Sequence, residues 1–185
     1  MRKIIFQVAV SLDGYFEGPN NELDWHNVEE QFNHYAIEFL RSLDLLLFGR
    51  TNYQMMEAYW TTRQAKKDDP VVAGFMNSLP KIVFSKQLHH VTWENTKLIN
   101  DHVEEEIKQL KNMPGKNIAI FGGSDFVTSI IPSGLIDEYR IMVCPVFLGG
   151  GKTLFGGIRE RLQLDLEKTE KFKSGNIMLY YRPKK

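Results

Sequence analysis

Two junctions in the sequence have the same form, in which an apolar run is followed by glycine and then by a helix start. They are LLLFGRTNYQ (residues 45–54) and IAIFGGSDF (residues 118–126). The first turn of a helix has unpaired backbone N–H groups and the positive end of the helix dipole, so each junction can bind an anion. The chemistry that this predicts is phosphate or diphosphate binding. The candidate residues are Gly49, Arg50, Thr51, Gly122, Gly123, Ser124 and Asp125.

Side chains at these junctions strengthen the prediction. Thr51 is expected to cap its helix, with Gln54 reaching back as in a capping box, and Ser124 or Asp125 is expected to cap the other helix. Arg50 adds a planar fork of donors suited to phosphate. Any strand-to-helix turn contains free N–H groups, so a purely structural role for either junction remains an alternative.

A third apolar run ends in Ser85 and Lys86, which supply another hydroxyl and another cation. If its strand is parallel to the others, both residues reach the same edge of the sheet, where ligands of open α/β sheets bind. An additional, doubly charged phosphate would suit this group of residues.

The stretch VFLGGGKTLF (residues 146–155) ends like the phosphate loop of nucleoside triphosphatases. That loop requires a further glycine where this chain has Val146, and it requires a helix after the threonine, whereas here Gly156 and Gly157 follow closely. The triphosphatase interpretation is therefore rejected. We expect a glycine-rich connection between strands.

Composition restricts the class of protein. The 185 residues are predicted to form one domain, 1–185, and the 23 basic and 23 acidic residues cancel, which predicts no nucleic-acid partner and no anionic membrane partner. No apolar run is long enough to span a bilayer. The one cysteine, Cys144, lies in an apolar run and is expected to be buried, which favours the cytoplasm. The histidines show no zinc-ligand spacing, so we expect no metal.

Strand and helix patterns alternate over the first two thirds of the chain. Such alternation predicts parallel strands joined by right-handed crossovers. The predicted strands are 3–10, 45–48, 82–84 and 118–121, and the predicted helices begin near residues 27, 51, 103 and 126.

The C-terminal third has a different pattern. Residues 136–147, 162–171 and 177–182 read as long strands without helices between them. We expect this part to be antiparallel and attached to the same sheet. Its outer strand would expose an edge, which favours pairing with a second copy of the chain.

Several motifs of the sequence resemble those of a known family. The motifs SLDG, Asp24-Trp25, FGRTNY, VFSK and IFGGSDF are similar to those of the dihydrofolate reductase superfamily. More closely, SLDG together with FGGSDFVTSIIPSGLIDEYRIMVCPVFLGGGKTLF resembles the reductase domain of bifunctional riboflavin-biosynthesis deaminase-reductases and its stand-alone relatives. The likeness covers nearly the whole chain. It implies a three-layer α/β/α fold with a mixed, mostly parallel sheet of about eight strands and an antiparallel C-terminal part.

The resemblance also implies NADPH as cofactor. By motif, Gly49, Arg50 and Thr51 would contact the pyrophosphate or the 2′-phosphate, with Ser85 and Lys86 at the latter. The residues from Gly122 to Asp125 would contact the pyrophosphate from the other side, and Ala9 and Phe121 would flank the nicotinamide. NADPH is preferred to NADH because Arg50 and Lys86 suit a phosphate, whereas an acidic residue that would read a bare ribose has no candidate.

The substrate end carries two candidate carboxylates with catalytic roles. Glu30 lies five residues after Trp25, as the pterin-binding carboxylate does in dihydrofolate reductases, although Asn27 and Glu30 also form a possible N-cap pair. Asp13 either orients the substrate or closes a turn with Gly14. A proton must reach the acceptor during hydride transfer, from an acid or from water.

Further residues are candidates for substrate binding. Trp25 can stack on a flat heterocycle, although aromatic residues near a first strand are more often core. Gly150 and Lys152 would border the pocket, with Lys152 available to an anionic group. Connection of two strands is the alternative role for this loop.

Three functions follow from these patterns. The first is an NADPH-dependent reductase of a pyrimidine-type heterocycle, resembling 5-amino-6-(5-phosphoribosylamino)uracil reductase. The second is a dihydrofolate reductase with an altered tail site, because residues 77–81 lack the arginine that holds the folate tail. The third is a non-catalytic dinucleotide-binding protein with the same fold. The related reductases tend to pair, so a homodimer is expected.

Overall fold

The computed structural model describes residues 1–122 and 124–184. Its centre is an eight-stranded sheet with the order β5-β4-β3-β6-β1-β7-β10-β9. A small second sheet pairs β2 with β8. The strands are β1 (Ile4–Ser11), β2 (Tyr15–Glu17), β3 (Leu43–Gly49), β4 (Lys81–Phe84), β5 (Thr96–Ile99), β6 (Asn117–Phe121), β7 (Glu138–Cys144), β8 (Lys152–Thr153), β9 (Leu164–Lys171) and β10 (Ile177–Pro183).

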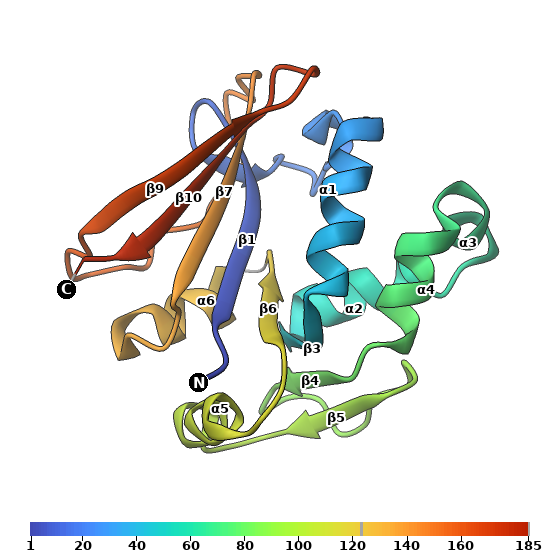
Figure 1. Cartoon of the computed structure of the whole chain (residues 1–185), viewed down its shortest axis with the longest axis vertical. Helices are drawn as coiled ribbons and strands as arrows, with labels where there is room; N and C mark the ends of the chain where they lie inside the picture. Colours follow the sequence, from blue (N-terminus) through green and yellow to red (C-terminus); the bar gives the residue numbers. More distant parts are fainter. Residues whose placement is uncertain (123, 185) are drawn as a thin grey trace.

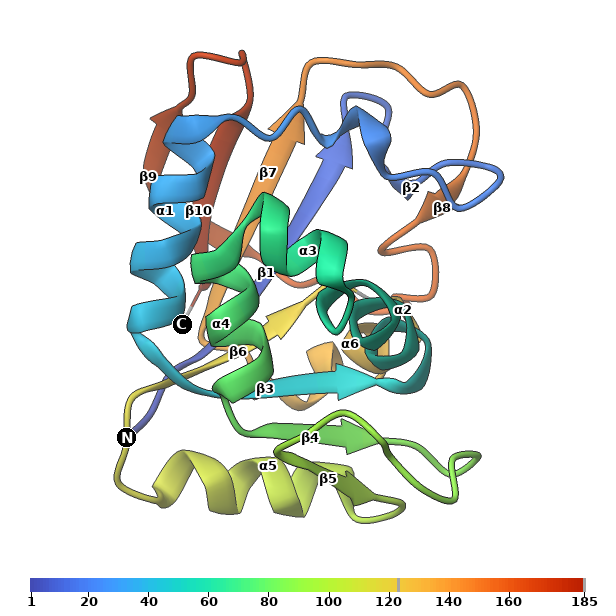
Figure 2. The ribbon, with the colours of Figure 1, turned by 90° about the vertical axis from the view of Figure 1, so that its right-hand side faces the viewer.

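Helices cover both faces of the large sheet, which gives three layers (Figure 1). Helices α1, α2 and α4 pack on one face, and α5 and α6 pack on the other (Figure 2). The helices are α1 (Glu30–Arg41), α2 (Arg50–Trp60), α3 (Arg63–Asp68), α4 (Pro70–Ser78), α5 (Val103–Asn112) and α6 (Ser124–Ile130), with the 3₁₀ turns η1 (Asp24–His26) and η2 (Ile131–Ser133). The three-layer prediction is confirmed.

The sheet is mostly parallel, as predicted. Strands β5, β4, β3, β6, β1 and β7 pair in parallel with their neighbours. The prediction of an antiparallel C-terminal part holds for β10, which runs against both β7 and β9. For β7 the prediction holds on one side only, because this strand is antiparallel to β10 but pairs in parallel with β1, from Ile5↔Glu138 to Ser11↔Cys144. Helix α6 carries the chain back across the sheet before β7 begins, so a parallel crossover becomes possible there.

The inner strands are apolar on both faces because helices cover both. In β6, Ile118 and Ile120 pack with α5 and α6, whereas Ala119 faces the layer of α1, α2 and α4. All three are at most 1% exposed. Cys144 is also buried, as predicted. This two-sided burial explains the continuous apolar runs that identified the strands.

Several short elements were absent from the sequence-based prediction. Residues 63–78 form α3 and α4, whose N-caps are Thr62 and Asp69, and each cap accepts a backbone N–H bond. The edge strand β5 and the β2–β8 pair are only a few residues long. Short segments carry too few periods of an apolar pattern to be recognised from sequence.

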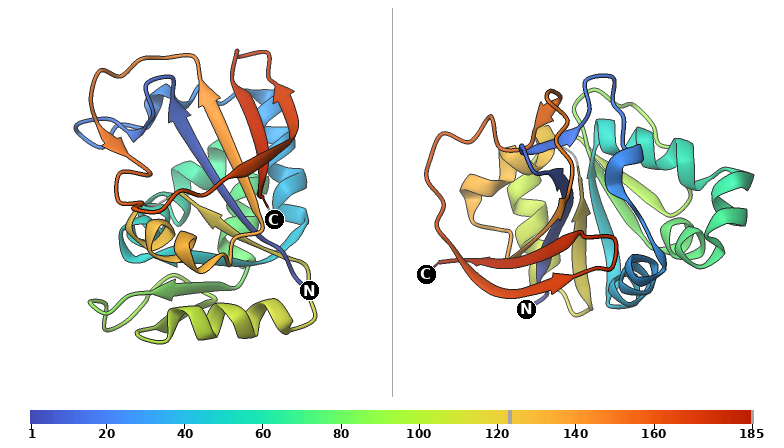
Figure 3. Two further views of the ribbon diagram at one scale, coloured as in Figure 1. Left: turned by 90° about the vertical axis from the view of Figure 1, so that its left-hand side faces the viewer. Right: turned by 90° about the horizontal axis from the view of Figure 1, so that it is seen from above.

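The carboxyl ends of the parallel strands form one edge of the molecule. The strand order places the ends of β3, β6 and β1 side by side in the middle of this edge (Figure 3). The residues that end β3 and β6 are Gly49 and Phe121, the starting points of the two predicted anion turns.

Leu47→Ala tests the packing of this central region. Leu47 is 0% exposed in β3 between two covered faces, so truncation should lower the free energy of unfolding by about 2–5 kcal/mol. Val71→Ala on α4, where the side chain is 45% exposed, is the control and should change it by less than about 0.5 kcal/mol. Urea denaturation measures both, and similar losses for the two variants would contradict the assigned core.

Candidate functional site

The two anion turns lie next to each other. Strands β3 and β6 are neighbours with Leu47 opposite Ile120, so α2 and α6 begin from adjacent strand ends on opposite faces of the sheet. Asn52 of α2 donates a side-chain hydrogen bond to the carbonyl oxygen of Phe121. This contact ties the first turn of α2 to the start of the turn that leads into α6.

Glycine is required at both turns. A Cβ atom at Gly49 would lie 2.6 Å from the Cβ of Phe126 on α6, which leaves no space for a side chain. Gly122 has φ +50°, a left-handed conformation that favours glycine. Gly123 lies outside the described residues, and of Ser124 only its position at the start of α6 is described. Asp125 is exposed in the first turn of the same helix.

The predicted caps of α2 were wrong. The N-cap is Gly49, which has no side chain, and Thr51 is exposed inside the helix rather than ahead of it. The N-cap residue therefore makes no side-chain hydrogen bond to the first amides of this helix. Arg50 is exposed at the same point, with its Nη1 atom 3.5 Å from Oε1 of Gln54. This arrangement supports anion binding more than the predicted capping box would.

Asn52 provides an independent sign of a ligand at this edge. The residue is 4% exposed, and its Oδ1 atom is buried without a hydrogen-bond partner among the described residues. Buried polar groups are normally paired, because an unpaired one costs about 1–3 kcal/mol. Asn52 is also the side chain nearest to Gly122, since a Cβ there would lie 3.6 Å from Oδ1. A polar ligand between the two turns would therefore meet a preformed amide group.

Ser85 and Lys86 reach the same edge from β4, the strand next to β3. The Ser85 hydroxyl accepts hydrogen bonds from the amides of Gln87 and Leu88 and so shapes the loop that follows. Lys86 is exposed, with its Nζ atom 3.5 Å from Asp101. Beside this loop is a groove of about 270 Å³, lined by Tyr53, Gln54, Glu57, Gln87, Leu88, His89, His90 and Thr92.

Asp13 anchors the glycine loop. Its carboxylate accepts hydrogen bonds from the hydroxyl of Ser11 at 2.6 Å and from the amides of Leu148 and Gly149 at 3.1 and 2.8 Å. These bonds, led by the one from Ser11, lower the pKa of Asp13. The group is therefore an ionised acceptor at neutral pH. Its geometry favours positioning the loop, and its predicted catalytic role stays a prediction.

Lys152 belongs to β8, which pairs with β2, and no phosphate-loop helix follows it. Its Nζ atom lies 2.8 Å from Oε1 of Glu17 and 2.9 Å from Oδ1 of Asn21. Gly150 lies close to Pro19. The loop thus connects two strands beside the end of β1, and Lys152 is already paired with a carboxylate.

Glu30 lies away from the inward face of α1. It is exposed and lines a groove of about 370 Å³ with Glu29, Gln31, His34 and Lys173. The alternative of an Asn27–Glu30 capping pair was wrong, because the N-cap is Glu29 and Asn27 donates to the carbonyl of Ser174. The catalytic role of Glu30 stays a prediction, without a contact to the two anion turns.

Trp25 and Ala9 come together near the ends of β1 and β7. Both pack partly buried against a cluster containing Met142 and Cys144. The Trp25 indole donates to the carbonyl of Glu22 at 2.9 Å and meets the ring of His26 edge-on at 4.5 Å. Burial lowers the pKa of His26 to about 4, so this ring is neutral at physiological pH. Trp25 is therefore a packing residue that stays partly exposed.

Polar residues that the sequence analysis did not select lie on the face that α1 covers. The hydroxyl of Tyr35 donates to Gln7 Oε1 at 2.5 Å and accepts from Arg140 Nη1 at 3.1 Å. Tyr35 had the spacing of a core residue in an amphipathic helix. The signal in the sequence that could have identified this group is that Gln7 and Arg140 interrupt strands that are otherwise mostly apolar.

Two kinds of feature are absent from the described residues. No group of three or more His, Cys, Asp or Glu side chains there is arranged to hold a metal ion. In the same part of the chain, no helix combines the length and the apolar character that crossing a bilayer requires.

Sequence comparison relates the chain to one family and to two similar proteins. The sequence model of the RibD C-terminal domain matches residues 2–178. The Bacillus subtilis (strain 168) protein YyaP is 34% identical over 180 residues, which cover 97% of this chain and 94% of YyaP. YwjB of the same strain is 30% identical over 181 residues, 97% of each chain.

Solved structures share the fold. A putative riboflavin biosynthesis protein from Shewanella sp. PV-4 superposes with a TM-score of 0.75 at 27% identity over the full length of both chains. A Thermotoga maritima diaminohydroxyphosphoribosylaminopyrimidine deaminase/5-amino-6-(5-phosphoribosylamino)uracil reductase gives 0.73 at 15% identity, covering 99% of this chain and 57% of that one. A pyrimidine reductase-like protein from Corynebacterium diphtheriae gives 0.68 at 15% identity, covering 100% and 92%.

Asp13→Asn tests the anchoring of the glycine loop. The variant should exchange the amide hydrogens of Leu148 and Gly149 faster near neutral pH, because a neutral amide is a weaker acceptor than a carboxylate. Ile120 is the internal control. Because the folded pKa is lowered, the anchor is complete above the ordinary range of aspartate and is lost as the pH falls through the lowered value. Unchanged exchange rates of both loop amides would show that Asp13 does not anchor the glycine loop.

Proposed function

Because this chain belongs to the RibD C-terminal domain family, we propose that it is an NADPH-dependent reductase of a pyrimidine-type heterocycle. The observation that carries the proposal is the juxtaposition of two helix N-termini at adjacent strand ends. The comparison with a putative riboflavin biosynthesis protein at 27% identity supports the substrate class. The compound we expect is similar to 5-amino-6-(5-phosphoribosylamino)uracil.

The residues present suit a dinucleotide. The uncapped amides of α2 and the turn that begins at Gly122 would hold the pyrophosphate, and the orphan Oδ1 of Asn52 would accept a hydrogen bond beside it. Thr51 and Asp125 would border the same group. Ala9 and Phe121, both half-buried at the ends of β1 and β6, would flank the nicotinamide.

Positive charge favours the 2′-phosphate of NADPH over the bare ribose of NADH. Arg50 and Lys86 are exposed at the ends of the neighbouring strands β3 and β4, and Ser85 offers a hydroxyl between them. The groove lined by Gln54 and Gln87 lies beside these residues and would take the adenosine end.

The chain would bring a flat substrate to the ends of β1 and β7. When bound, the reduced nicotinamide supplies a hydride to a C=N or C=O bond. Trp25 would stack on the heterocycle, while Asp13 would fix the loop that contains Gly150. Lys152 would bind an anionic substrate group only after leaving Glu17. We retain Glu30, at the outer rim of α1, as a candidate catalytic carboxylate.

Cofactor titration followed by turnover tests the proposed function. Nicotinamide fluorescence should show NADPH binding, and absorbance at 340 nm should fall when 5-amino-6-(5-phosphoribosylamino)uracil is added. Dihydrofolate is the comparison substrate, and its selective reduction would indicate a dihydrofolate reductase instead. Binding without oxidation by any pterin or pyrimidine would mean a non-catalytic dinucleotide-binding protein.

Arg50→Ala tests recognition of the 2′-phosphate. Charge-assisted hydrogen bonds contribute about 1.5–3 kcal/mol, so the Kd for NADPH should rise about 10- to 100-fold while the Kd for NADH changes little. Arg63→Ala, at an exposed arginine that follows the other end of α2, is the matched control. Equal weakening of both dinucleotides in Arg50→Ala would show that Arg50 does not read the phosphate.

We also propose a homodimer. Strand β9 ends the described sheet and pairs there with β10 alone, and its Leu166 is 53% exposed. An uncovered edge strand with an exposed apolar side chain favours pairing with another copy. Light scattering at low micromolar concentration should give twice the chain mass of 21.5 kDa. A mass of one chain would refute the dimer.

A further inference from the structure

A row of side chains, polar except for the phenylalanine at its start, crosses the sheet on the face that α1 covers. Strand register places its members side by side on consecutive strands. The row runs from the end of β6, beside the predicted cofactor turn, to the edge strand β9. In this order, its residues are Phe121, Gln7, Arg140, Tyr180 and Lys168.

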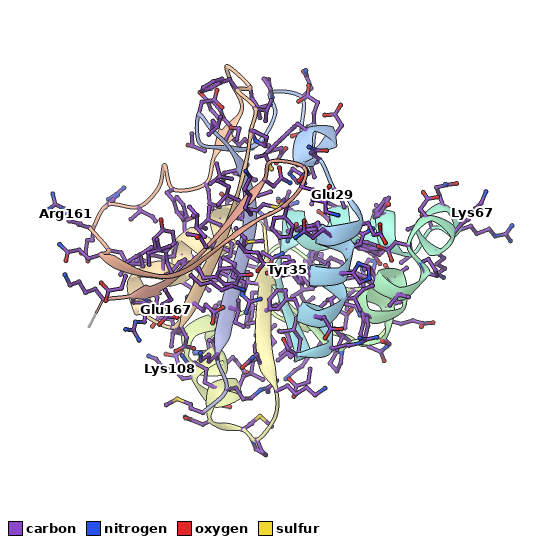
Figure 4. The ribbon with its side chains drawn as sticks, turned by 45° about the horizontal axis from the view of Figure 1, so that its top comes forward. Glu29, Tyr35, Lys67, Lys108, Arg161 and Glu167 are labelled. Atoms are coloured by element: carbon purple, nitrogen blue, oxygen red, sulfur yellow. The ribbon has the colours of Figure 1, made fainter. Side chains whose placement is uncertain are left out.

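Tyr35 projects from α1 onto the middle of this row (Figure 4). Its hydroxyl donates to Gln7 Oε1 at 2.5 Å and accepts from Arg140 Nη1 at 3.1 Å. The phenol is thus held at a fixed place by β1 on one side and by β7 on the other.

Arg140 is itself rigidly held. Its Nε atom donates to Glu138 Oε1 at 2.7 Å, and its guanidinium lies 4.2 Å from the ring centre of Phe39 and 5.2 Å from that of Tyr180. Its side chain is 16% exposed. Arg140 is thus paired with Glu138 and also lies close enough to the Tyr35 oxygen to stabilise a negative charge that forms there.

The residues around Tyr35 are not completely buried. Gln7 and Ala9 lie on β1, an interior strand, and α1 covers their face, yet both are only half-buried. Tyr35 and Phe121 are half-buried as well. Ala9 and Phe121 are the residues proposed to flank the nicotinamide. The Tyr35 hydroxyl is therefore hydrogen-bonded to β1, the strand that carries Ala9.

We propose that Tyr35 donates the proton that accompanies hydride transfer, and that Gln7 and Arg140 position it. This inference rests on the proposed reductase function. An acceptor atom of the substrate would replace Gln7 Oε1 as the partner of the hydroxyl. Glu30 and Asp13, the candidates from sequence, lie respectively on the outer rim of α1 and in the loop anchor.

The step balances in atoms and electrons. The carbon of a C=N or C=O bond would receive a hydride, with its electron pair, from a C–H bond of a reduced nicotinamide, which would thereby be oxidised. The π electrons of the double bond move to its nitrogen or oxygen, the Tyr35 O–H bond breaks, and its proton forms the new N–H or O–H bond. The phenolate that remains beside Arg140 takes a proton from water.

The protonation state agrees with this role. Burial raises the pKa of Tyr35, and Arg140 acts against that increase. Tyr35 is consequently a neutral phenol at physiological pH, so it has a proton to donate, and its phenolate has a cation nearby.

Tyr35→Phe tests the donor, because it removes the hydroxyl and keeps the ring. Tyr59→Phe, at a tyrosine of α2 that is 49% exposed, is the matched control. Both variants should bind NADPH with the wild-type Kd. Tyr35→Phe should oxidise NADPH with 5-amino-6-(5-phosphoribosylamino)uracil about 10²- to 10⁴-fold more slowly in kcat, whereas Tyr59→Phe should match wild type.

Tyrosinate absorbance at 295 nm gives a measurement that needs no turnover. The difference between wild type and Tyr35→Phe isolates the ionisation of Tyr35. The charged or titratable groups around it are Arg140 and Glu138 from β7, Tyr180 from β10, and Glu170 and Lys168 from β9. In Arg140→Gln, the ionisation should begin at higher pH, because a nearby positive charge is lost. Arg140→Lys keeps the positive charge, so it should change the pH at which Tyr35 ionises by less. This variant replaces Arg140→Gln in the experiment if Arg140→Gln does not fold.

The outcomes separate this inference from the function on which it rests. Slow turnover of Tyr35→Phe with unchanged NADPH binding, together with the upward shift in Arg140→Gln, supports the donor role. Wild-type turnover in Tyr35→Phe, or an unchanged ionisation in Arg140→Gln, overturns it while leaving the reductase intact. A wild-type protein that binds NADPH but reduces no acceptor overturns both proposals.

Discussion

The rest of the proposed site depends on one constraint, which is the pairing of the adjacent strands β3 and β6. Gly49 must lack a side chain because α6 lies directly against it, and Asn52 joins the start of α2 to the carbonyl oxygen of Phe121. These two contacts force helices from opposite faces of the sheet to begin at one place. The positive ends of the two helix dipoles then lie at one edge of the sheet, where their partial charges add.

The second part of the proposed site depends on helix α1, which covers one face of the sheet. Strand β1 passes beside β6 and carries Gln7 and Ala9 to the α1 face, where Tyr35 and Arg140 complete a polar row. The hydrogen bonds fix the tyrosine while the region remains half-buried. The proposed cofactor turn after β6 and the proposed proton donor beneath α1 are thus linked through the neighbouring strands β6 and β1.

The sequence was informative where local pattern decides structure. Apolar runs identified the inner strands because both faces are buried, and glycine after β3 and β6 located the turns. Prediction from the sequence failed where contacts between distant segments decide the structure. The Thr51 cap was wrong because helix α2 begins at Arg50, and β7 proved parallel to β1 because α6 carries the chain across the sheet. Tyr35 had the spacing of a packing residue, and its hydrogen bonds depend on β1 and β7 lying side by side.

The central claim is that the two turns bind one diphosphate together. Backbone amide NMR during titration with NADPH tests it directly, because each turn reports separately. We predict that signals of residues 50–53 and 122–126 shift together along one saturation curve, while those of the exposed edge strand β9 remain in place. Shifts confined to one turn, or appearing in neither, would contradict the account.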